Sequence, residues 1–337
     1  MRHTPRSRRS VGASHPERSP HPRASSITAR VAAIDLGTNT VRLLVAEVTP
    51  HAAGWRTVLA EQRVTRLGEG FRTTGELGDA AAARTAAAVI DYVARARSAG
   101  ATRVAIAATS AVRDASNGRV FVRDLEQATG IGVRIISGEE EACLTLAGIV
   151  AGLGRLPGVV VAFDIGGGST EYMLARDGAL VTAVSLRLGV VPLAERFPLP
   201  NAVEPSRYTE LRAAVQTQLV RELPPTLATR LDMLVGTAGT VTTLAALDLG
   251  LAEYDPARVQ GHVLTRVAIE RQRRRLNALD VAGRAALPCL EPGRADLIVG
   301  GVAIVEATLD QLGIEQLTVS DWSLREGLVA ELAARQV

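Results

Sequence analysis

One short pattern occurs twice in this chain and constrains its fold more than any other feature. Val31–Leu36 is an apolar run that ends in Asp-Leu-Gly, and Val159–Phe163 is an apolar run that leads into Asp-Ile-Gly. Asp164 of the second copy lies 129 positions after Asp35 of the first. A second apolar run follows each copy, which predicts two β-hairpins. A duplication of this kind predicts two related domains that face each other across a cleft.

The two copies differ at one matched position. Thr40 aligns with Ser169, so a hydroxyl is present in both turns, but Arg42 aligns with Glu171. The second hairpin therefore carries a negatively charged side chain where the first carries a positively charged one.

Outside the two copies, apolar runs alternate with longer amphipathic or Ala-rich segments, as in α/β proteins. The sequence predicts strands over Val41–Val48, Arg103–Ala108, Val133–Ile136, Leu231–Val235 and Gln316–Val319, and helices over Ala80–Ser98, Gly118–Thr129, Glu139–Ala151, Arg294–Leu312 and Ser323–Ala334. We place the first domain at residues 31–150 and the second at 151–337. The last helix is expected to pack back on the first domain.

The first 30 residues differ in composition from the rest of the chain. They hold seven Arg, one Glu and almost no large apolar residues, which predicts a disordered basic tail. This tail carries more positive charge than the net +3 of the whole chain, so the body is slightly acidic. The charge therefore does not indicate a specific nucleic-acid partner. No apolar run approaches the ~20 residues of a membrane helix, so no membrane partner is expected.

Several functional classes are excluded by residues that the chain lacks. All 38 basic residues are Arg, so a Walker-A loop, a protein kinase and lysine Schiff-base chemistry are impossible. Outside the tail the only histidines are His51 and His262, which excludes a His-rich metal site. Cys143 and Cys289 are far apart and form no zinc pattern, so we expect reduced thiols and a cytoplasmic location.

Three turns rich in Gly and hydroxyl residues each follow a predicted strand. Their N–H groups could form anion-binding nests, so the three together predict a phosphate-binding cleft, with ordinary hairpin turns as the alternative. The candidate phosphate ligands are Asp35, Gly37, Thr38, Asn39 and Thr40 in the first turn, Gly166, Gly167, Gly168, Ser169 and Thr170 in the second, and Gly236, Thr237, Gly239 and Thr240 in the third.

A carboxylate beside a phosphate nest needs a cation between them. Asp164 and Glu171 are seven positions apart across a tight hairpin, which can bring both to one mouth, where Mg²⁺ would bridge them and phosphate oxygens. The alternative is a turn-forming Asp and a surface strand Glu.

Two further polar segments have competing interpretations. Glu139, Glu140 and Glu141 begin a predicted helix, where acids favour the positive end of the helix dipole, yet one of them could be a general base. Spacing does not choose among the three. Arg113 could donate to phosphate oxygens or form an ordinary surface ion pair.

These segments together resemble the exopolyphosphatase / guanosine pentaphosphate phosphatase (Ppx/GppA) family over about residues 31–330. The matching segments run in the family's order. They are AAIDLGTNTVRLLVAE, ATSAVRDASNG, ISGEEEA, FDIGGGSTEY, SLRLGVVPLAERF, GTAGTVTTLAAL, RADLIVGG and VSDWSLREGL.

The resemblance implies a two-domain, ribonuclease-H-like fold of the actin and sugar-kinase superfamily, with the active site in the cleft. It implies that Glu141 is the catalytic base, that Asp164 and Glu171 are the Mg²⁺-associated carboxylates, and that Arg113 lies near the substrate. The implied activity is hydrolysis of terminal phosphate from inorganic polyphosphate by a homodimer. Hydrolysis of pppGpp is the alternative, and an actin-like nucleotide-binding protein or a kinase is a more distant one.

Two departures from the family pattern stand out. Thr38 and Thr40 occupy positions where many relatives carry serines, and the hydroxyls are kept. Long members of the family have further C-terminal helical domains that this sequence does not contain, so features of those domains are not expected here.

Overall fold

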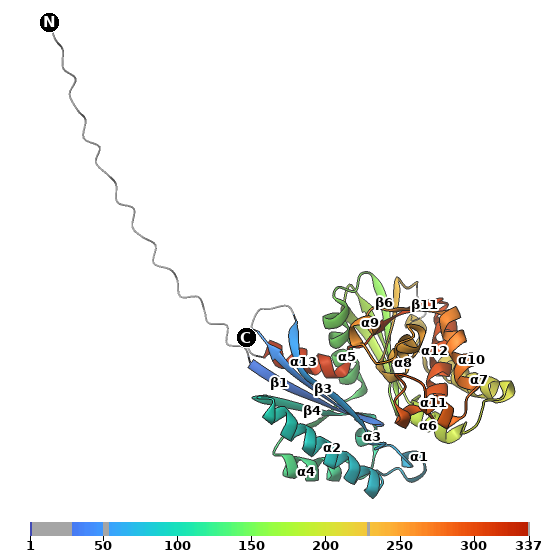
Figure 1. Ribbon diagram of the computed structural model, residues 1–337, viewed down its shortest axis with the longest axis horizontal. Helices are drawn as coiled ribbons and strands as arrows, with labels where there is room; N and C mark the ends of the chain where they lie inside the picture. The colour runs from blue at the N-terminus through green and yellow to red at the C-terminus, as the bar shows by residue number, and fades with distance from the viewer. Residues whose placement is uncertain (2–28, 50–53, 228–229, 336–337) are drawn as a thin grey trace.

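The computed structural model describes residue 1 and residues 29–49, 54–227 and 230–335. Two α/β domains lie side by side with a pair of helices between them (Figure 1). This confirms the predicted fold class. Most of the predicted tail lies outside the described residues. Its last two residues, however, belong to the first strand, because Ala29 pairs with Val48 and Arg30 bonds Glu47 at 3.2 Å.

The first domain is built on a five-stranded sheet in the order β3-β2-β1-β4-β5. The strands are β1 (Ala29–Leu36), β2 (Thr40–Val48), β3 (Trp55–Val64), β4 (Arg103–Ala108) and β5 (Val133–Ile135). Helices α2 (Asp79–Ser98) and α4 (Gly118–Thr129) bury one face of the sheet. The C-terminal helix α13 (Leu324–Ala334) buries part of the other face against β1 and β2.

The second domain repeats this topology. Its sheet has the order β10-β11-β9-β6-β7-β8, with β6 (Val159–Ile165), β7 (Thr170–Arg176), β8 (Ala179–Leu186), β9 (Met233–Thr237), β10 (Val263–Thr265) and β11 (Gln316–Ser320). Strands β6, β7, β8, β9 and β11 match β1 to β5 in order and direction. The duplication inferred from the two Asp-x-Gly segments thus extends to whole domains.

Helices cover both faces of the second sheet. The large core on one face contains α7 (Pro205–Glu222), α8 (Ala238–Asp248), α10 (Arg266–Asn277) and α12 (Ile298–Leu312). The other face packs on α5 (Gly138–Leu153). The short elements are α1 (Phe71–Thr74), α3 (Ser110–Asp114), α6 (Val190–Arg196), α9 (Pro256–Val259), α11 (Val281–Ala285), η1 (Pro225–Leu227) and η2 (Pro292–Arg294). Within the described residues, no helix is both long and apolar enough to cross a membrane.

Helices α5 and α13 form the pair between the domains. A Cβ at Gly327 of α13 would lie 1.8 Å from the carbonyl oxygen of Leu144 in α5, so the two backbones touch directly. A side chain here would separate the helices. The N-terminus of α5, which enters the cleft, is set by a capping box of Ser137 and Glu140.

The predicted helix over Arg294–Leu312 begins too early. Pro292 opens the short turn η2, which ends at Arg294, and α12 starts only at Ile298. Proline suits the first position of such a turn, because the N–H group that it lacks would have no partner there. The separate turn allows the Arg294 side chain to reach the cleft instead of lying along the helix.

Candidate active site

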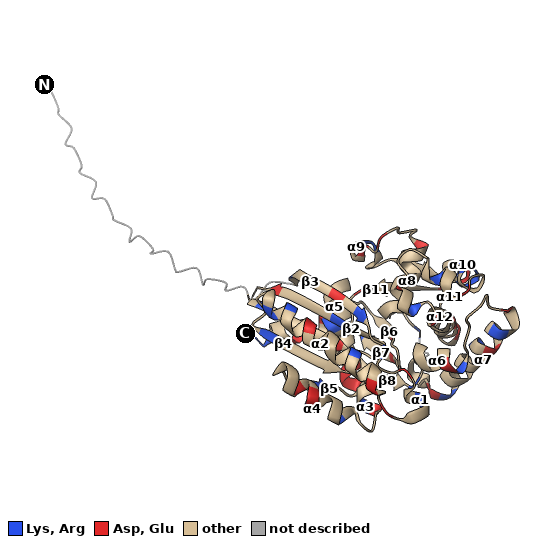
Figure 2. Ribbon diagram, turned by 60° about the horizontal axis from the view of Figure 1, so that its bottom comes forward, with Lys and Arg blue, Asp and Glu red and all other residues tan. Residues whose placement is uncertain are grey.

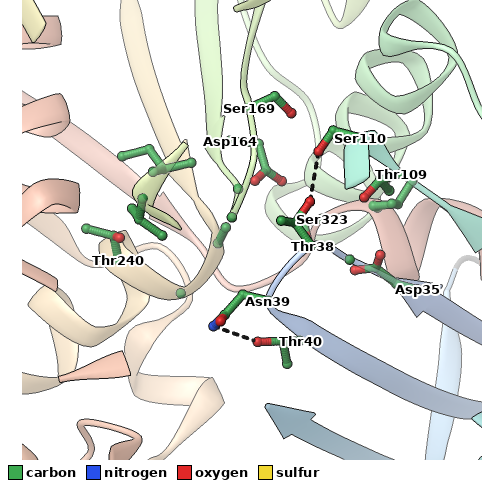
Figure 3. Close-up of a pocket in the computed structure, with 18 of the residues that line it drawn as sticks. Asp35, Thr38, Asn39, Thr40, Thr109, Ser110, Asp164, Ser169, Thr240 and Ser323 are labelled. Atoms are coloured by element: carbon green, nitrogen blue, oxygen red, sulfur yellow. Dashed lines mark hydrogen bonds between the residues drawn. The ribbon is translucent and has the colours of Figure 1, made fainter. Parts of the chain in front are cut away.

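A cavity of about 110 Å³ lies between the turns of the two matched hairpins, and both domains contribute to it. Figure 3 shows Thr38–Thr40 of the first hairpin, Asp164 and Ser169 of the second, and Thr240 on a separate wall. Most predicted site residues line this cavity. They are Asp35, Gly37, Thr38, Asn39, Thr40, Glu141, Asp164, Gly166, Gly167, Ser169, Gly239 and Thr240.

Other predicted residues lie behind the cavity wall. Gly236 is in β9, where a Cβ would be 2.9 Å from the Phe163 ring, and Thr237 is fully buried and donates to the Trp322 carbonyl at 3.4 Å. Thr170 donates to the carbonyl of Leu188. Gly168, Arg113 and Glu171 likewise do not line the cavity. These residues shape the loops that present their neighbours.

The two hairpin turns touch each other. A Cβ at Gly167 would lie 3.0 Å from the backbone nitrogen of Asn39, and one at Gly168 would lie 2.7 Å from the Ser110 hydroxyl. The Thr38 and Ser110 hydroxyls share a hydrogen bond of 2.9 Å (Figure 3). Glycine is required at these positions by the close approach, because any side chain would push the loops apart.

The two hairpins differ in charge because Arg42 of the first is matched by Glu171 of the second. Asp164 and Glu171 are direct cross-strand partners on β6 and β7, just as Asp35 and Arg42 are on β1 and β2. Burial, followed by repulsion from Glu171, raises the pKa of Asp164 to about 7. Burial also raises the pKa of Asp35 to about 6, against the opposing effect of Arg42. The positive charge near these two carboxylates is therefore too small to offset the effect of burial on their pKa values.

The carboxylates present fit a Mg²⁺ ion whose ligands come partly from the protein and partly from water and substrate phosphate. Within residues 29–49, 54–227 and 230–335, no group of three or more His, Cys, Asp or Glu side chains could hold a metal ion by itself. Mg²⁺ commonly binds through one or two carboxylates while water and substrate phosphates complete its shell. Asp164 at the cavity and Glu171 beside it offer such carboxylates, and a cation would relieve their repulsion.

The structure separates the three adjacent acids of α5. Glu139 and Glu140 are exposed, whereas Glu141 is only 9% exposed and lines the cavity. Arg113 donates to Glu141 Oε2 at 3.1 Å and to the Ile136 carbonyl at 3.0 Å. Burial and then Glu171 raise the pKa of Glu141 well above its usual range, and Arg113 opposes this shift. Arg113 thus holds one oxygen of this carboxylate in place.

Two arginines in the cavity wall were not predicted. Arg294 donates to the Thr40 hydroxyl at 3.3 Å, and a Cβ at Gly239 would lie 2.0 Å from its Nη1. Arg42 donates to the Ser323 hydroxyl at 3.2 Å. Within the described part of the chain, neither forms an ion pair within 4.0 Å. Burial and the charge of Arg42 lower the pKa of Arg294 to about 10.

These two guanidinium groups give the cavity positive charge that suits a phosphate group. The duplication offered one clue to this, because Arg42 aligns with Glu171. Nothing local marked Arg294, which reaches the cavity only through tertiary packing. Thr109, Ser110 and Ser323 add further hydroxyls to the wall and were also missed as site residues.

Comparison with known proteins gives a consistent picture. The chain is 39% identical over 325 residues to "Exopolyphosphatase 2" of Mycobacterium tuberculosis, covering 90% of this chain and 98% of that protein. It is 28% identical to the guanosine-5'-triphosphate,3'-diphosphate pyrophosphatase of Photobacterium profundum, covering 90% of this chain but 59% of that protein.

Solved structures agree in fold. An exopolyphosphatase from Cytophaga hutchinsonii superposes with a TM-score of 0.84 at 25% identity, covering 91% of this chain and 98% of that one. The Aquifex aeolicus member of the Ppx/GppA family superposes with a TM-score of 0.78 at 29% identity, covering 92% and 99%. Residues 44–336 match the Ppx/GppA phosphatase family as a whole. The chain therefore belongs to the Ppx/GppA phosphatase family.

Proposed function

We propose that this protein is an exopolyphosphatase, which hydrolyses the terminal phosphoanhydride bond of inorganic polyphosphate and releases orthophosphate. The observation that carries the proposal is the setting of Glu141. Its carboxylate is buried at the edge of a cavity that is also lined by hydroxyls, glycine-rich turns, the carboxylates of Asp35 and Asp164, and the two arginines without carboxylate partners. A base next to such a phosphate-sized site favours attack by water.

The reaction follows from these positions. Glu141 accepts a proton from a water molecule, and the water oxygen forms a bond to the terminal phosphorus. The bond from that phosphorus to the bridging oxygen breaks, and the shortened chain leaves with the electron pair. Arg42, Arg294 and the N–H groups of the turns stabilise the charge on the phosphoryl oxygens. The raised pKa of Glu141 makes it a stronger base than an ordinary glutamate.

We infer that Asp164 and Glu171 hold Mg²⁺. When bound, the ion would supply positive charge beside the phosphoryl oxygens. Burial raises the pKa of both carboxylates above the usual range, and repulsion from Glu171 adds to the rise at Asp164.

Hydrolysis of the 5′ γ-phosphate of pppGpp is the second candidate. Its support is the similarity to the Photobacterium profundum pyrophosphatase, and it would use the same base and the same cavity. The two candidate reactions differ only in the leaving group, which is the shortened polyphosphate in one and ppGpp in the other.

Phosphate release from polyphosphates of defined length and from pppGpp, with and without Mg²⁺, tests the proposal. We expect a higher kcat/KM for polyphosphate, loss of turnover without Mg²⁺, and no turnover by Glu141→Gln. A preference for pppGpp would replace the proposed substrate with the second candidate. Release from neither substrate would overturn both.

We also propose a homodimer in the cytoplasm. The homodimer rests on the family resemblance and the location on the cysteine pattern. Cys143 and Cys289 are both free thiols, as a reducing compartment requires. Sedimentation analysis of the purified protein would test the homodimer, and cell fractionation would test the location.

A further inference from the structure

A second, larger cavity of about 470 Å³ lies next to the candidate active site. Thr38 and Ser110 line both cavities, so they form the partition between them. The first domain contributes α1 and part of α3 to the second cavity, and the second domain contributes the turn after β8 and helix α6. Figure 2 shows α1 lying beside α6 where the two domains meet.

The partition is polar. It consists of the hydrogen-bonded Thr38 and Ser110 hydroxyls together with Gly168, whose backbone packs so closely on them that a Cβ would lie 2.7 Å from the Ser110 hydroxyl. The backbone nitrogens of Val190 and Val191, just after the turn that lines the second cavity, donate to the carbonyls of Gly166 and Gly167 at 3.2 and 2.9 Å. The second cavity is therefore built directly onto the phosphate loop.

The charged side chains of this cavity are mostly basic. They are Arg72, Asp114, Arg187, Glu195 and Arg196. Arg187 lies 3.8 Å from Asp114, and the carboxylate of Glu195 accepts a hydrogen bond from the Gly70 nitrogen. In the described part of the chain, Arg72 and Arg196 have no carboxylate within 4.0 Å. Two guanidinium groups are thus available for an anion.

The second cavity lies on the side of the catalytic base. Asp114, in its wall, also contacts Arg113 at 3.5 Å, and Arg113 holds Glu141. The Thr240 wall, where Gly239 accommodates Arg294, lies across the first cavity from Ser110 (Figure 3). Attacking and leaving oxygens are roughly in line in phosphoryl transfer. Water on the Glu141 side therefore places the remaining chain on the Arg294 side, away from the second cavity.

We propose that the second cavity is a product site, which binds the released orthophosphate beside Arg72 and Arg196 and gives it an exit separate from the shortened substrate. The phosphoryl group moves away from the leaving chain as the new bond to water forms, and therefore toward this cavity. This product site rests on the proposed function in one respect, that orthophosphate is released. Hydrolysis of polyphosphate and hydrolysis of pppGpp both release it.

Product inhibition provides the kinetic test. Orthophosphate that binds at a separate site should inhibit wild type noncompetitively against polyphosphate, because the chain can remain bound. In Arg72→Gln/Arg196→Gln, we expect the noncompetitive inhibition constant to rise about tenfold, which equals about 1.4 kcal/mol. The KM for polyphosphate should change less than about twofold. The matched control is Arg119→Gln/Arg176→Gln, which removes the same charge from exposed positions outside both cavities.

Calorimetric titration with inorganic phosphate provides a readout without turnover. We expect two phosphates per wild-type chain, one per Arg72→Gln/Arg196→Gln chain, and two for the control. One phosphate per wild-type chain would overturn the inference, as would unchanged inhibition in the variant. A KM that rises with chain length in the variant would also overturn it, because the arginines would then bind the polymer. Failure of wild type to hydrolyse either substrate would refute the proposed function while the titration still decides the product site.

Discussion

Asp164 on β6 and Glu171 on β7 face each other across one strand pair, at the positions where the first hairpin pairs Asp35 with Arg42. The same backbone unit therefore pairs an acid with an arginine in one domain and with a second acid in the other. Burial and the repulsion between the two carboxylates raise the pKa of Asp164, so the folded second hairpin favours an extra proton or a bound cation.

Asp164→Asn is expected to stabilise the protein in the absence of Mg²⁺ and to reduce the activity measured in the presence of Mg²⁺. A pKa raised to about 7 means that the folded state holds a proton which the unfolded chain releases near pH 4, so wild-type stability falls between about pH 4 and 7. Without screening, three pKa units would supply roughly 4 kcal/mol. Asp164 is only partly buried at the cavity wall, so we discount this value for solvent screening and expect about 1–2 kcal/mol at pH 8.

Thermal unfolding of both proteins at pH 5 and pH 8 without Mg²⁺ measures this effect. The gain in Tm should be larger at pH 8, and a higher Mg²⁺ concentration should be needed for half-maximal activity. Equal Tm values at both pH values, with an unchanged Mg²⁺ requirement, would end the metal assignment.

Glu141→Gln should abolish turnover while leaving substrate binding largely intact. Removing a general base lowers rates by about 10²–10⁴. Glu139→Gln and Glu140→Gln are the controls, because both side chains are exposed and glutamine at position 140 can still complete the capping box with Ser137. A measured kcat that fell for Glu140→Gln but not for Glu141→Gln would show that Glu140, and not Glu141, is the general base.

Arg113→Gln should shift the acid limb of the pH profile of kcat/KM to higher pH. Arg113 lowers the pKa of Glu141, so its loss lets that pKa rise and leaves less of the base ionised near neutral pH. Arg123→Gln, in which an exposed arginine beside Asp124 is removed, is the control. A uniform loss of rate with an unmoved limb would mean that Arg113 acts on substrate rather than through Glu141.

Gly168→Ala should lower kcat/KM at least about tenfold, because its Cβ would lie 2.7 Å from the Ser110 hydroxyl and separate the two loops. Overpacking of this kind typically lowers the free energy of unfolding by about 1–3 kcal/mol. Gly132→Ala is the control, because its Cβ would have no neighbour nearer than the Glu126 carboxylate at 3.9 Å, and it should change little. Adding Ser110→Ala to Gly168→Ala should restore part of the stability. Additive losses in denaturant unfolding would show that the two positions do not contact each other.

The C-terminal helix shows how far local pattern carries a prediction. Ser323–Ala334 is apolar at helical spacing, so a helix was expected, and α13 spans Leu324–Ala334. The exact domain boundary near residue 150 remains a prediction, because α5 packs against the second sheet and also against α13, which itself packs on the first sheet.

The sequence by itself determined the duplicated hairpins and the glycine-rich turns, and it placed Asp164 and Glu171 on either side of one such turn. Each depends on strand period and turn chemistry within a few residues, which the chain displays locally. Tertiary structure alone separated Glu141 from its neighbours by burial and carried Arg294 to Thr40, 254 positions away. It also created the cavity behind Thr38 and Ser110. Such contacts join segments far apart in the chain, and only the packing of the two domains brings them together.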